Sequence, residues 1–256
     1  GEALEKMGKV DTIAFDKTGT LTYGCLAVSD ILSFDDNLDE TKLLALTASA
    51  EAKSEHPLGK AIVSWAKEKG LSIVESTAFK MTTGKGIYAK VSERDLLCGN
   101  EKFLLEHGVT INRSVQTVLN RLRTEGKASI LVADGKQCVG VIALSDVLRP
   151  EAKDMVKQLD AMQTGTVLLT GDHQTTADYF ANRVGISGVR AELLPEEKVQ
   201  NIEALQKENH KVCMIGDGIN DAPALKTADV SVAMGGIGSD IAVDAADIAL
   251  VNDDIK

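Results

Sequence analysis

Aromatic residues and cysteines are scarce in this sequence. Phe, Trp and Tyr make up 4 % of 256 residues, and the four cysteines, Cys25, Cys98, Cys138 and Cys213, form no CxxC or Cys/His cluster. This spacing excludes a typical zinc site or disulfide framework and favours a reducing compartment. We therefore expect the cysteines to be small buried thiols.

Long apolar runs and excess positive charge are also lacking. No run approaches the roughly 18 residues of a membrane helix, and the N-terminal "GEALEKMGKV" has no signal-peptide pattern. Lysine and arginine total 28 against 38 acidic residues, a net charge of −10, so no nucleic-acid partner is expected and any phosphate contacts must be local. The 44 % hydrophobic content is enough for one large core or two ordinary ones.

Short β-rich runs, each ending in Asp or Gly, alternate with amphipathic helical stretches. Two of these helices are expected to begin at Pro150, running to Met162, and near Pro195. Such alternation predicts an α/β fold, in which helices cover a parallel sheet. The four runs are Val10–Asp16, Thr166–Asp172, Lys211–Asp217 and Asp229–Gly235.

The segment between Gly24 and Leu144 has a different pattern of predicted helices and strands. Helices are predicted near Leu38–Ala52 and at His56–Lys69, followed by mostly short strands and a hairpin turning on Asp134-Gly135. About 120 residues thus separate the first strand from the rest of its sheet, which favours an inserted domain. The expected domains are 1–23 with 145–256, interrupted by an inserted α+β domain at 24–144.

Polar residues gather where the predicted parallel strands end. Ligands bind at this edge of an open sheet, although Asp and Gly also simply mark turns. The turn explanation is weak for the whole set, which comprises Asp16, Thr170, Asp172 and Asp217, together with Lys198 and Asp221 further along the chain.

These residue types suit phosphoryl transfer. A carboxylate attacks phosphorus, Mg²⁺ neutralises charge, and a lysine and a hydroxyl hold the phosphoryl oxygens. We assign Asp16 as the nucleophile, Asp217 as a metal ligand, and Thr170 and Lys198 as phosphoryl-binding residues. Asp221 either holds Mg²⁺ through water or orients its direct ligands.

Three motifs, "DKTGTLT" (Asp16–Thr22), "TGD" (Thr170–Asp172) and "GDGINDAPAL" (Gly216–Leu225), resemble the phosphorylation domain of P-type ATPases. These cation pumps belong to the haloacid dehalogenase superfamily, and the resemblance covers essentially the whole chain. It implies a haloacid-dehalogenase-like Rossmannoid sheet and an aspartyl phosphate formed on Asp16 from ATP. It further implies Mg²⁺ bound by Asp16, the Thr18 carbonyl and Asp217, and makes Lys198 the superfamily lysine.

Thr18 departs from the pattern of the soluble phosphatases of this superfamily. They carry a general acid and base two residues after the nucleophile, whereas a threonine hydroxyl of high pKa does not readily activate water. A long-lived phosphoenzyme is the expected consequence, which suits a pump.

In the insert, "EAKSEHPLGKAI" (Glu51–Ile62), "TTGKGIYA" (Thr82–Ala89) and "CGNEKFL" (Cys98–Leu104) are individually weak signals, compatible with helix caps and an ordinary turn. "TGKG" lacks the spacing of a P-loop. Together they resemble the nucleotide-binding domain of heavy-metal P-type ATPases. The resemblance implies an ATP site, in which a carboxylate accepts from the adenine amino group and glycines let the backbone approach. The implied residues are Glu51, His56, Gly84, Gly86 and Asn100.

"SDVLRPEA" (Ser145–Ala152) resembles the family's hinge, with Asp146 and Arg149 where the domains meet. The resemblance implies a soluble loop at the cytoplasmic face of a membrane. Its implied partners are an actuator domain of the same protein and a heavy-metal cation carried by membrane helices. The amino-acid sequences of Lys9–Thr22 and Ala246–Ile255 resemble those of zinc, cadmium and lead exporters more than those of copper exporters.

Two other interpretations remain open. One is a free-standing haloacid-dehalogenase-type phosphatase whose insert is a substrate-selecting cap. The other is a regulatory ATP-binding module without chemistry, which the presence of Asp16, Lys198 and Asp217 disfavours.

Overall fold

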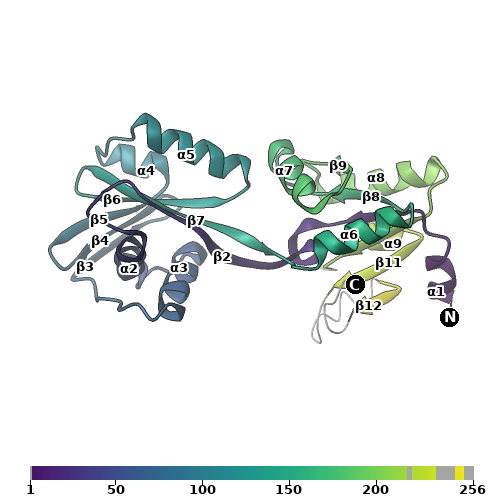
Figure 1. The fold of residues 1–256 in the computed structure, drawn as a ribbon, viewed down its shortest axis with the longest axis horizontal. Helices are drawn as coiled ribbons and strands as arrows, with labels where there is room; N and C mark the ends of the chain where they lie inside the picture. Colours follow the sequence, from purple (N-terminus) through teal and green to yellow (C-terminus); the bar gives the residue numbers. More distant parts are fainter. Residues whose placement is uncertain (1, 218–220, 235–245, 251–256) are drawn as a thin grey trace. The chain divides into compact units, whose positions relative to one another are not determined.

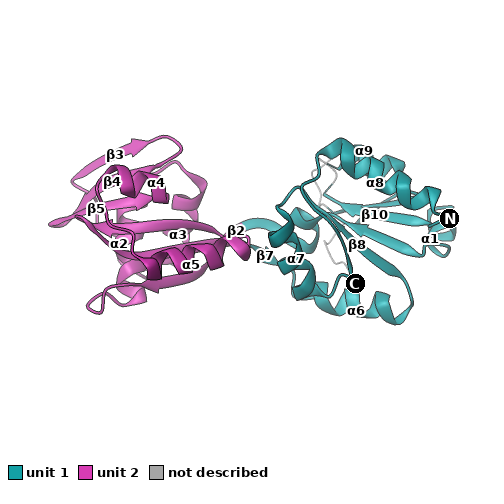
Figure 2. Ribbon diagram, turned by 90° about the horizontal axis from the view of Figure 1, so that it is seen from above, with its two compact units in different colours: residues 1–25, 146–256 teal, residues 26–145 magenta. Residues whose placement is uncertain are grey.

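The computed structural model describes residues 2–217, 221–234 and 246–250 (Figure 1). Two compact units are present: unit 1 comprises Gly1–Cys25 and Asp146–Lys256, and unit 2 comprises Leu26–Ser145 (Figure 2). The expected insert, 24–144, differs from unit 2 by two residues at its start and one at its end. The chain passes between the units within two long strands, β2 (Thr22–Ser33) and β7 (Gln137–Leu148).

Unit 1 is built on a six-stranded sheet in the order β12-β11-β10-β1-β8-β9, with every neighbouring pair parallel. Phe15, at the end of β1, pairs with Ile215 on one side and Leu168 on the other, so the carboxyl ends of three strands meet at one edge. The strands are β1 (Thr12–Phe15), β8 (Gly165–Leu169), β9 (Gly188–Arg190), β10 (Val212–Gly216), β11 (Val230–Met234) and β12 (Ile248–Leu250).

Helices cover both faces of this sheet. Strand side chains alternate between faces, so Ile13 and Phe15 pack with α6 and α7, whereas Ala14 packs with residues of α8 and α9. The expected α/β fold is confirmed. The helices are α1 (Glu2–Met7), α6 (Ala152–Ala161), α7 (Gln174–Val184), α8 (Pro195–Lys207) and α9 (Ala222–Thr227).

The predicted start of one helix at Pro150 is wrong. Pro150 and Glu151 form a turn that is closed by the Ala152 N–H donating to the Arg149 carbonyl at 3.2 Å, and α6 begins at Ala152. The helix predicted near Pro195 does begin there, with proline in the first turn.

Unit 2 contains a second six-stranded sheet, ordered β2-β7-β6-β5-β4-β3 and antiparallel from β7 to β3. Its inner strands bury side chains on both faces, against α2 and α3 on one and α4 and α5 on the other. The elements are α2 (Glu40–Glu51), α3 (Pro57–Glu68), β3 (Ala78–Thr82), β4 (Gly86–Val91), β5 (Arg94–Gly99), α4 (Glu101–Glu106), α5 (Arg113–Thr124) and β6 (Ala128–Asp134).

Parts of this unit differ from expectation. The sequence pattern missed α5 and indicated α4 only through Asn100 as a possible cap, and β2 and β7, at 12 residues each, are not short. The hairpin turns on Gly135 and Lys136 rather than Asp134-Gly135, because Asp134 pairs with Gln137 and the glycine takes a φ of 59°. Cys25 is exposed, unlike the other three thiols.

None of the helices in the described part of the chain is both long enough and apolar enough to span a membrane.

Candidate active site and nucleotide pocket

Asp16 directly follows β1 at the carboxyl edge of the unit 1 sheet. Its N–H continues the strand pairing by donating to the Ile215 carbonyl at 2.9 Å, which fixes the backbone between β1 and β10. The residue is 8 % exposed. Its side chain is therefore held in place at the rim of a buried site.

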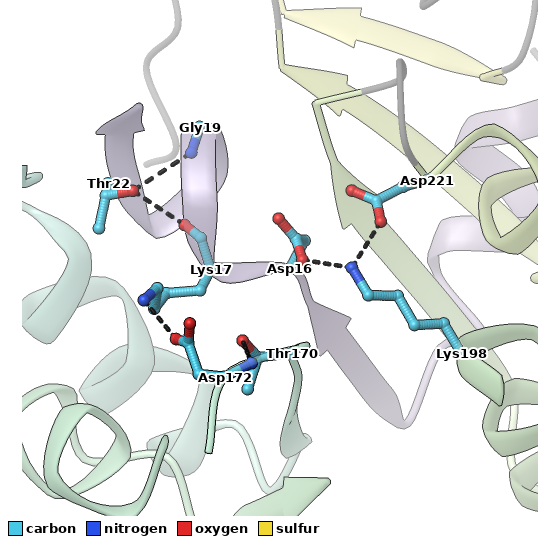
Figure 3. Close-up of polar contacts among 8 residues, drawn as sticks. All are labelled: Asp16, Lys17, Gly19, Thr22, Thr170, Asp172, Lys198 and Asp221. Atoms are coloured by element: carbon cyan, nitrogen blue, oxygen red, sulfur yellow. Dashed lines mark hydrogen bonds and ion pairs between the residues drawn. The ribbon is translucent and has the colours of Figure 1, made fainter. Parts of the chain in front are cut away.

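Lys198, from α8, connects two carboxylates. Its Nζ lies 2.6 Å from Asp16 Oδ1 and 2.8 Å from Asp221 Oδ1 (Figure 3). The first turn of α8 sets the position of this lysine, because the Glu197 carboxylate accepts from the Leu194 N–H at 2.7 Å. Asp221 is 1 % exposed, so this triad lies almost entirely out of water.

Burial and charge shift the pKa values in this cluster. Burial raises the pKa of Asp16 to about 6, the Asp221 carboxylate adds to that shift, and Lys198 opposes it. Burial acts to lower the pKa of Lys198, but the two carboxylates outweigh it, so the net pKa is raised. The Asp217 carboxylate also acts to raise the pKa of Asp16, so Asp16 is affected by two other carboxylates and by one ammonium group.

The loop after Asp16 approaches Asp217 closely. Gly19 has a φ of 75°, and a Cβ at this position would lie 3.2 Å from the Asp217 Cβ. The Gly19 N–H donates to the Thr22 hydroxyl at 3.2 Å, which fixes the loop (Figure 3). Within it Thr18 is exposed. Glycine is needed here because a side chain would be strained and would crowd Asp217.

Residues from the predicted hinge support this loop. The Asp146 carboxylate accepts from the Thr22 hydroxyl at 2.5 Å and from the Cys25 N–H at 3.0 Å. Arg149 is buried and donates from Nε to the Thr20 carbonyl at 2.8 Å. Both hinge residues therefore act on the backbone that follows Asp16.

Thr170 and Asp172 follow β8, the neighbour of β1 in the sheet. Thr170 is buried, and its hydroxyl accepts from the Asp172 N–H at 3.2 Å. Asp172 forms an ion pair with Lys17 (Figure 3). Sequence reasoning missed this pair, although the parallel register of β1 and β8 places Lys17 and Asp172 just beyond adjacent strand ends.

The residues at this edge fit a hard divalent cation. Asp221 Oδ2 is buried without a hydrogen-bond partner in the described part of the chain, and carboxylate and carbonyl oxygens are the ligands that Mg²⁺ prefers. No three acidic, histidine or cysteine side chains form a metal-binding group by themselves within those ranges. That is the usual situation for Mg²⁺, which binds one or two carboxylates and completes its shell with water and phosphate oxygens.

Unit 2 contains a cavity of about 380 Å³. All five residues of the predicted ATP site line it: Glu51, His56, Gly84, Gly86 and Asn100. They come from the end of α2, the starts of α3 and α4, and the β3–β4 turn, so the fold brings together segments that lie up to about fifty positions apart.

Glu51 is a buried acidic residue of the cavity lining. It is 4 % exposed, and burial raises its pKa to about 7, with the Ser54 hydroxyl opposing the shift. The carboxylate packs closely on α3, because a Cβ at Gly59 would lie 2.4 Å from Glu51 Oε2. Glycine at this position thus makes room for the carboxylate.

His56 and Asn100 cap helices and line the cavity as well. The Leu58 N–H donates to His56 Nδ1 at 3.3 Å, and the Phe103 N–H donates to Asn100 Oδ1 at 2.9 Å. Asn100 also donates to the Gly84 carbonyl at 3.2 Å. The cap explanation and the binding-site explanation are therefore compatible.

Two facing glycines, Gly86 on β4 and Gly99 on β5, form one wall. A Cβ at Gly86 would lie 2.4 Å from the Cys98 carbonyl and 2.6 Å from the Phe103 ring, so no larger residue fits. Sequence reasoning did not assign Gly99, and its signal was the adjacent Asn100. No Phe, Tyr or Trp is among the described residues that line the cavity.

The haloacid dehalogenase-like hydrolase family model matches residues 10–229. The chain therefore belongs to this family of hydrolases. Copper-exporting P-type ATPases of Staphylococcus aureus, strains MRSA252 and JH9, are 42 % identical over 255 residues. The match covers the whole chain but 31 % of each relative, so the chain spans about a third of their length.

Two solved structures extend the comparison. A zinc-transporting PIB-type ATPase in the E2.Pi state aligns with a TM-score of 0.88 at 36 % identity, covering 98 % of this chain and 40 % of that one. The catalytic domain of the CPx-ATPase CopB-B aligns with a TM-score of 0.68 at 37 % identity, covering 100 % of this chain and 90 % of that one. Within the hydrolase family, the chain is thus a catalytic domain of the heavy-metal P-type ATPases, as its motifs predicted.

Proposed function

We propose that this chain binds ATP in unit 2 and accepts its γ-phosphoryl group on Asp16 in unit 1, as the catalytic part of a metal-exporting ATPase. The arrangement of Asp16, Lys198 and Asp221 carries this proposal. A buried carboxylate held 2.6 Å from a lysine at the carboxyl edge of a parallel sheet is placed to attack phosphorus.

Each neighbour of Asp16 has a defined part in this proposal. Asp16 Oδ1 contacts Lys198, and the lysine neutralises charge that develops on the phosphoryl oxygens. The buried Thr170 hydroxyl donates to one of those oxygens once the site is filled. The ion pair between Lys17 and Asp172 orients the first residue after the nucleophile.

Asp16, the Thr18 carbonyl and Asp217 would hold Mg²⁺, and Asp221 would orient these ligands. When bound, Mg²⁺ supplies positive charge to the phosphoryl oxygens and shields the attacking carboxylate from their repulsion. The close approach of Gly19 to Asp217 supports this assignment, since it brings the loop that follows Asp16 next to Asp217. Asp221 Oδ2, buried without a hydrogen-bond partner among the described residues, would accept a hydrogen bond from a water bound to the metal.

The cavity in unit 2 supports ATP as the phosphoryl donor. Glu51 would accept a hydrogen bond from the adenine amino group, while Gly84 and Gly86 let the backbone approach the ligand. His56 and Asn100 line the same cavity and would orient the nucleotide. The catalytic domain of CopB-B, to which this chain is similar, changes conformation upon nucleotide binding, which supports this assignment.

Thr18 favours a pump over a phosphatase. It occupies the position where a second aspartate would activate water, and its exposed hydroxyl is a poor general base. We further propose that a heavy-metal cation crosses a membrane domain of the full-length protein and that an actuator domain removes the phosphate. The chain would then lie on the cytoplasmic side. The relatives include copper exporters and a zinc transporter, so transport of zinc, cadmium or lead rather than copper stays a prediction.

ATP labelled at the γ-phosphate tests the proposed phosphorylation. With Mg²⁺ and an acid quench, we expect label on the protein that hydroxylamine removes and that maps to Asp16. The Asp16→Asn variant should bind ATP as the wild type does, because the cavity lies in the other unit, but should take up no label.

Calorimetric titration with ATP, beside a His56→Ala variant, tests the cavity separately. Weaker binding by the variant supports the assignment. Absence of ATP binding up to millimolar concentration, combined with steady hydrolysis of small phosphate esters, would support the phosphatase interpretation instead.

A further inference from the structure

The charge of the nucleotide cavity does not match an anionic ligand. Its acidic lining residues are Glu51 and Glu55, and the nearby Lys60 is already 2.8 Å from Glu55. Lys85 is the one lysine or arginine among the described residues that line the cavity. A ligand with several phosphate charges therefore has a single lysine, and no arginine, available to it among the described residues that line the cavity.

The backbone of Lys85 is fixed. Its N–H donates to the Thr82 carbonyl at 3.0 Å, and its carbonyl accepts from the Asn100 N–H at 2.9 Å. It lies between Gly84 and Gly86, which both line the cavity. The side chain therefore starts from a defined point on the cavity rim, while its flexible four-carbon stem lets the ammonium group move.

That ammonium group is held by Glu106, the last residue of α4. Lys85 Nζ lies 2.7 Å from one Glu106 oxygen and 2.9 Å from the other, and the two side chains are 36 % and 40 % exposed. The hydrogen bond from Lys85 lowers the pKa of Glu106, so this carboxylate is ionised at neutral pH. A solvent-exposed pair of this kind is weak and is readily exchanged for another anion.

We propose that Lys85 is a phosphate-binding residue of this cavity and that it exchanges Glu106 for the phosphate oxygens of the nucleotide. Glu106 is then an internal competitor that lowers the affinity for phosphorylated ligands. The inference depends on the proposed ATP site and adds to it a specific contact for the phosphates, together with the group that opposes the contact.

Exchange of Glu106 for phosphate at Lys85 should affect the binding of ATP but not that of adenosine. Adenosine, which has no phosphate, should not sense either side chain, because nothing displaces Glu106 from Lys85. ATP should gain the contact with Lys85 only after that displacement. The difference in affinity between ATP and adenosine therefore isolates the contribution of this pair.

Calorimetric titrations of the whole chain with ATP and with adenosine, without Mg²⁺ and at fixed ionic strength, test the proposal. We expect Lys85→Met to weaken ATP binding about five- to tenfold and adenosine binding less than about twofold. Glu106→Gln should tighten ATP binding about two- to fivefold without changing adenosine binding. Lys67→Met, an exposed lysine of α3 away from the cavity, controls for the loss of one positive charge.

Folding is checked by the emission of the single tryptophan, Trp65, which lies in α3 of the same unit. Lys85→Arg keeps the charge and should retain ATP binding. Unchanged ATP binding by Lys85→Met, or equal losses for ATP and adenosine, would overturn the inference and leave the ATP site standing. Failure of the wild type to bind either ligand would instead defeat the proposed function.

Discussion

Glu51→Gln tests whether ionisation of the buried Glu51 carboxyl group destabilises the folded chain. The pKa of Glu51 is raised from 4.5 to about 7 by burial. In the unfolded chain this group loses its proton near pH 4.5, whereas the folded chain keeps the proton until about pH 7. Stability is therefore fully present below pH 4.5 and is lost as the pH rises through 7.

The size of the loss follows from the shift. At about 1.36 kcal/mol per pKa unit, raising the pKa from 4.5 to about 7 costs about 3 kcal/mol of unfolding free energy at pH 8. Glutamine keeps the shape of the side chain but cannot ionise. The difference in stability, Glu51→Gln minus wild type, should thus rise by about 3 kcal/mol between pH 4.5 and pH 8.

Urea unfolding followed by Trp65 fluorescence measures this difference, because the single tryptophan lies in unit 2 with Glu51. Glu55→Gln is a matched control: Glu55 is exposed, and the hydrogen bond from Lys60 lowers its pKa, so its difference should not rise with pH. A Glu51→Gln difference that stays flat from pH 4.5 to pH 8 would refute the reasoning.

Four further substitutions have defined outcomes. Lys198→Met should destabilise unit 1 by about 3–5 kcal/mol in a calorimetric scan, since it leaves the Asp16 carboxylate buried without its cation; an unchanged transition would contradict this. Gly86→Ala should weaken ATP binding more than about tenfold, because its Cβ would lie 2.4 Å from a backbone carbonyl, whereas Gly84→Ala meets open space and should cost about 1 kcal/mol of stability with smaller effects on binding. Asp146→Ala should slow labelling of Asp16 without weakening ATP binding, and loss of both together would argue against a hinge role.

Local sequence patterns were enough to predict the parallel sheet, the residues at its carboxyl edge and two helix caps. The β-rich runs that end in Asp or Gly placed Asp16, Thr170 and Asp217 at one sheet edge, because parallel strands present their carboxyl ends together. The caps at His56 and Asn100 were also readable, since a cap depends on residues only a few positions away. Local signals of this kind survive in any tertiary context.

Tertiary structure decided which side chains meet. Lys198 reaches Asp16 across 182 positions of the chain, and Lys85 contacts Glu106 across two strands and a helix. The pair between Lys17 and Asp172 depends on strand order and register. None of these contacts leaves a periodic trace in the sequence, because each is fixed by the path of the chain and the packing of both units' cores, which bring distant segments to within hydrogen-bond distance.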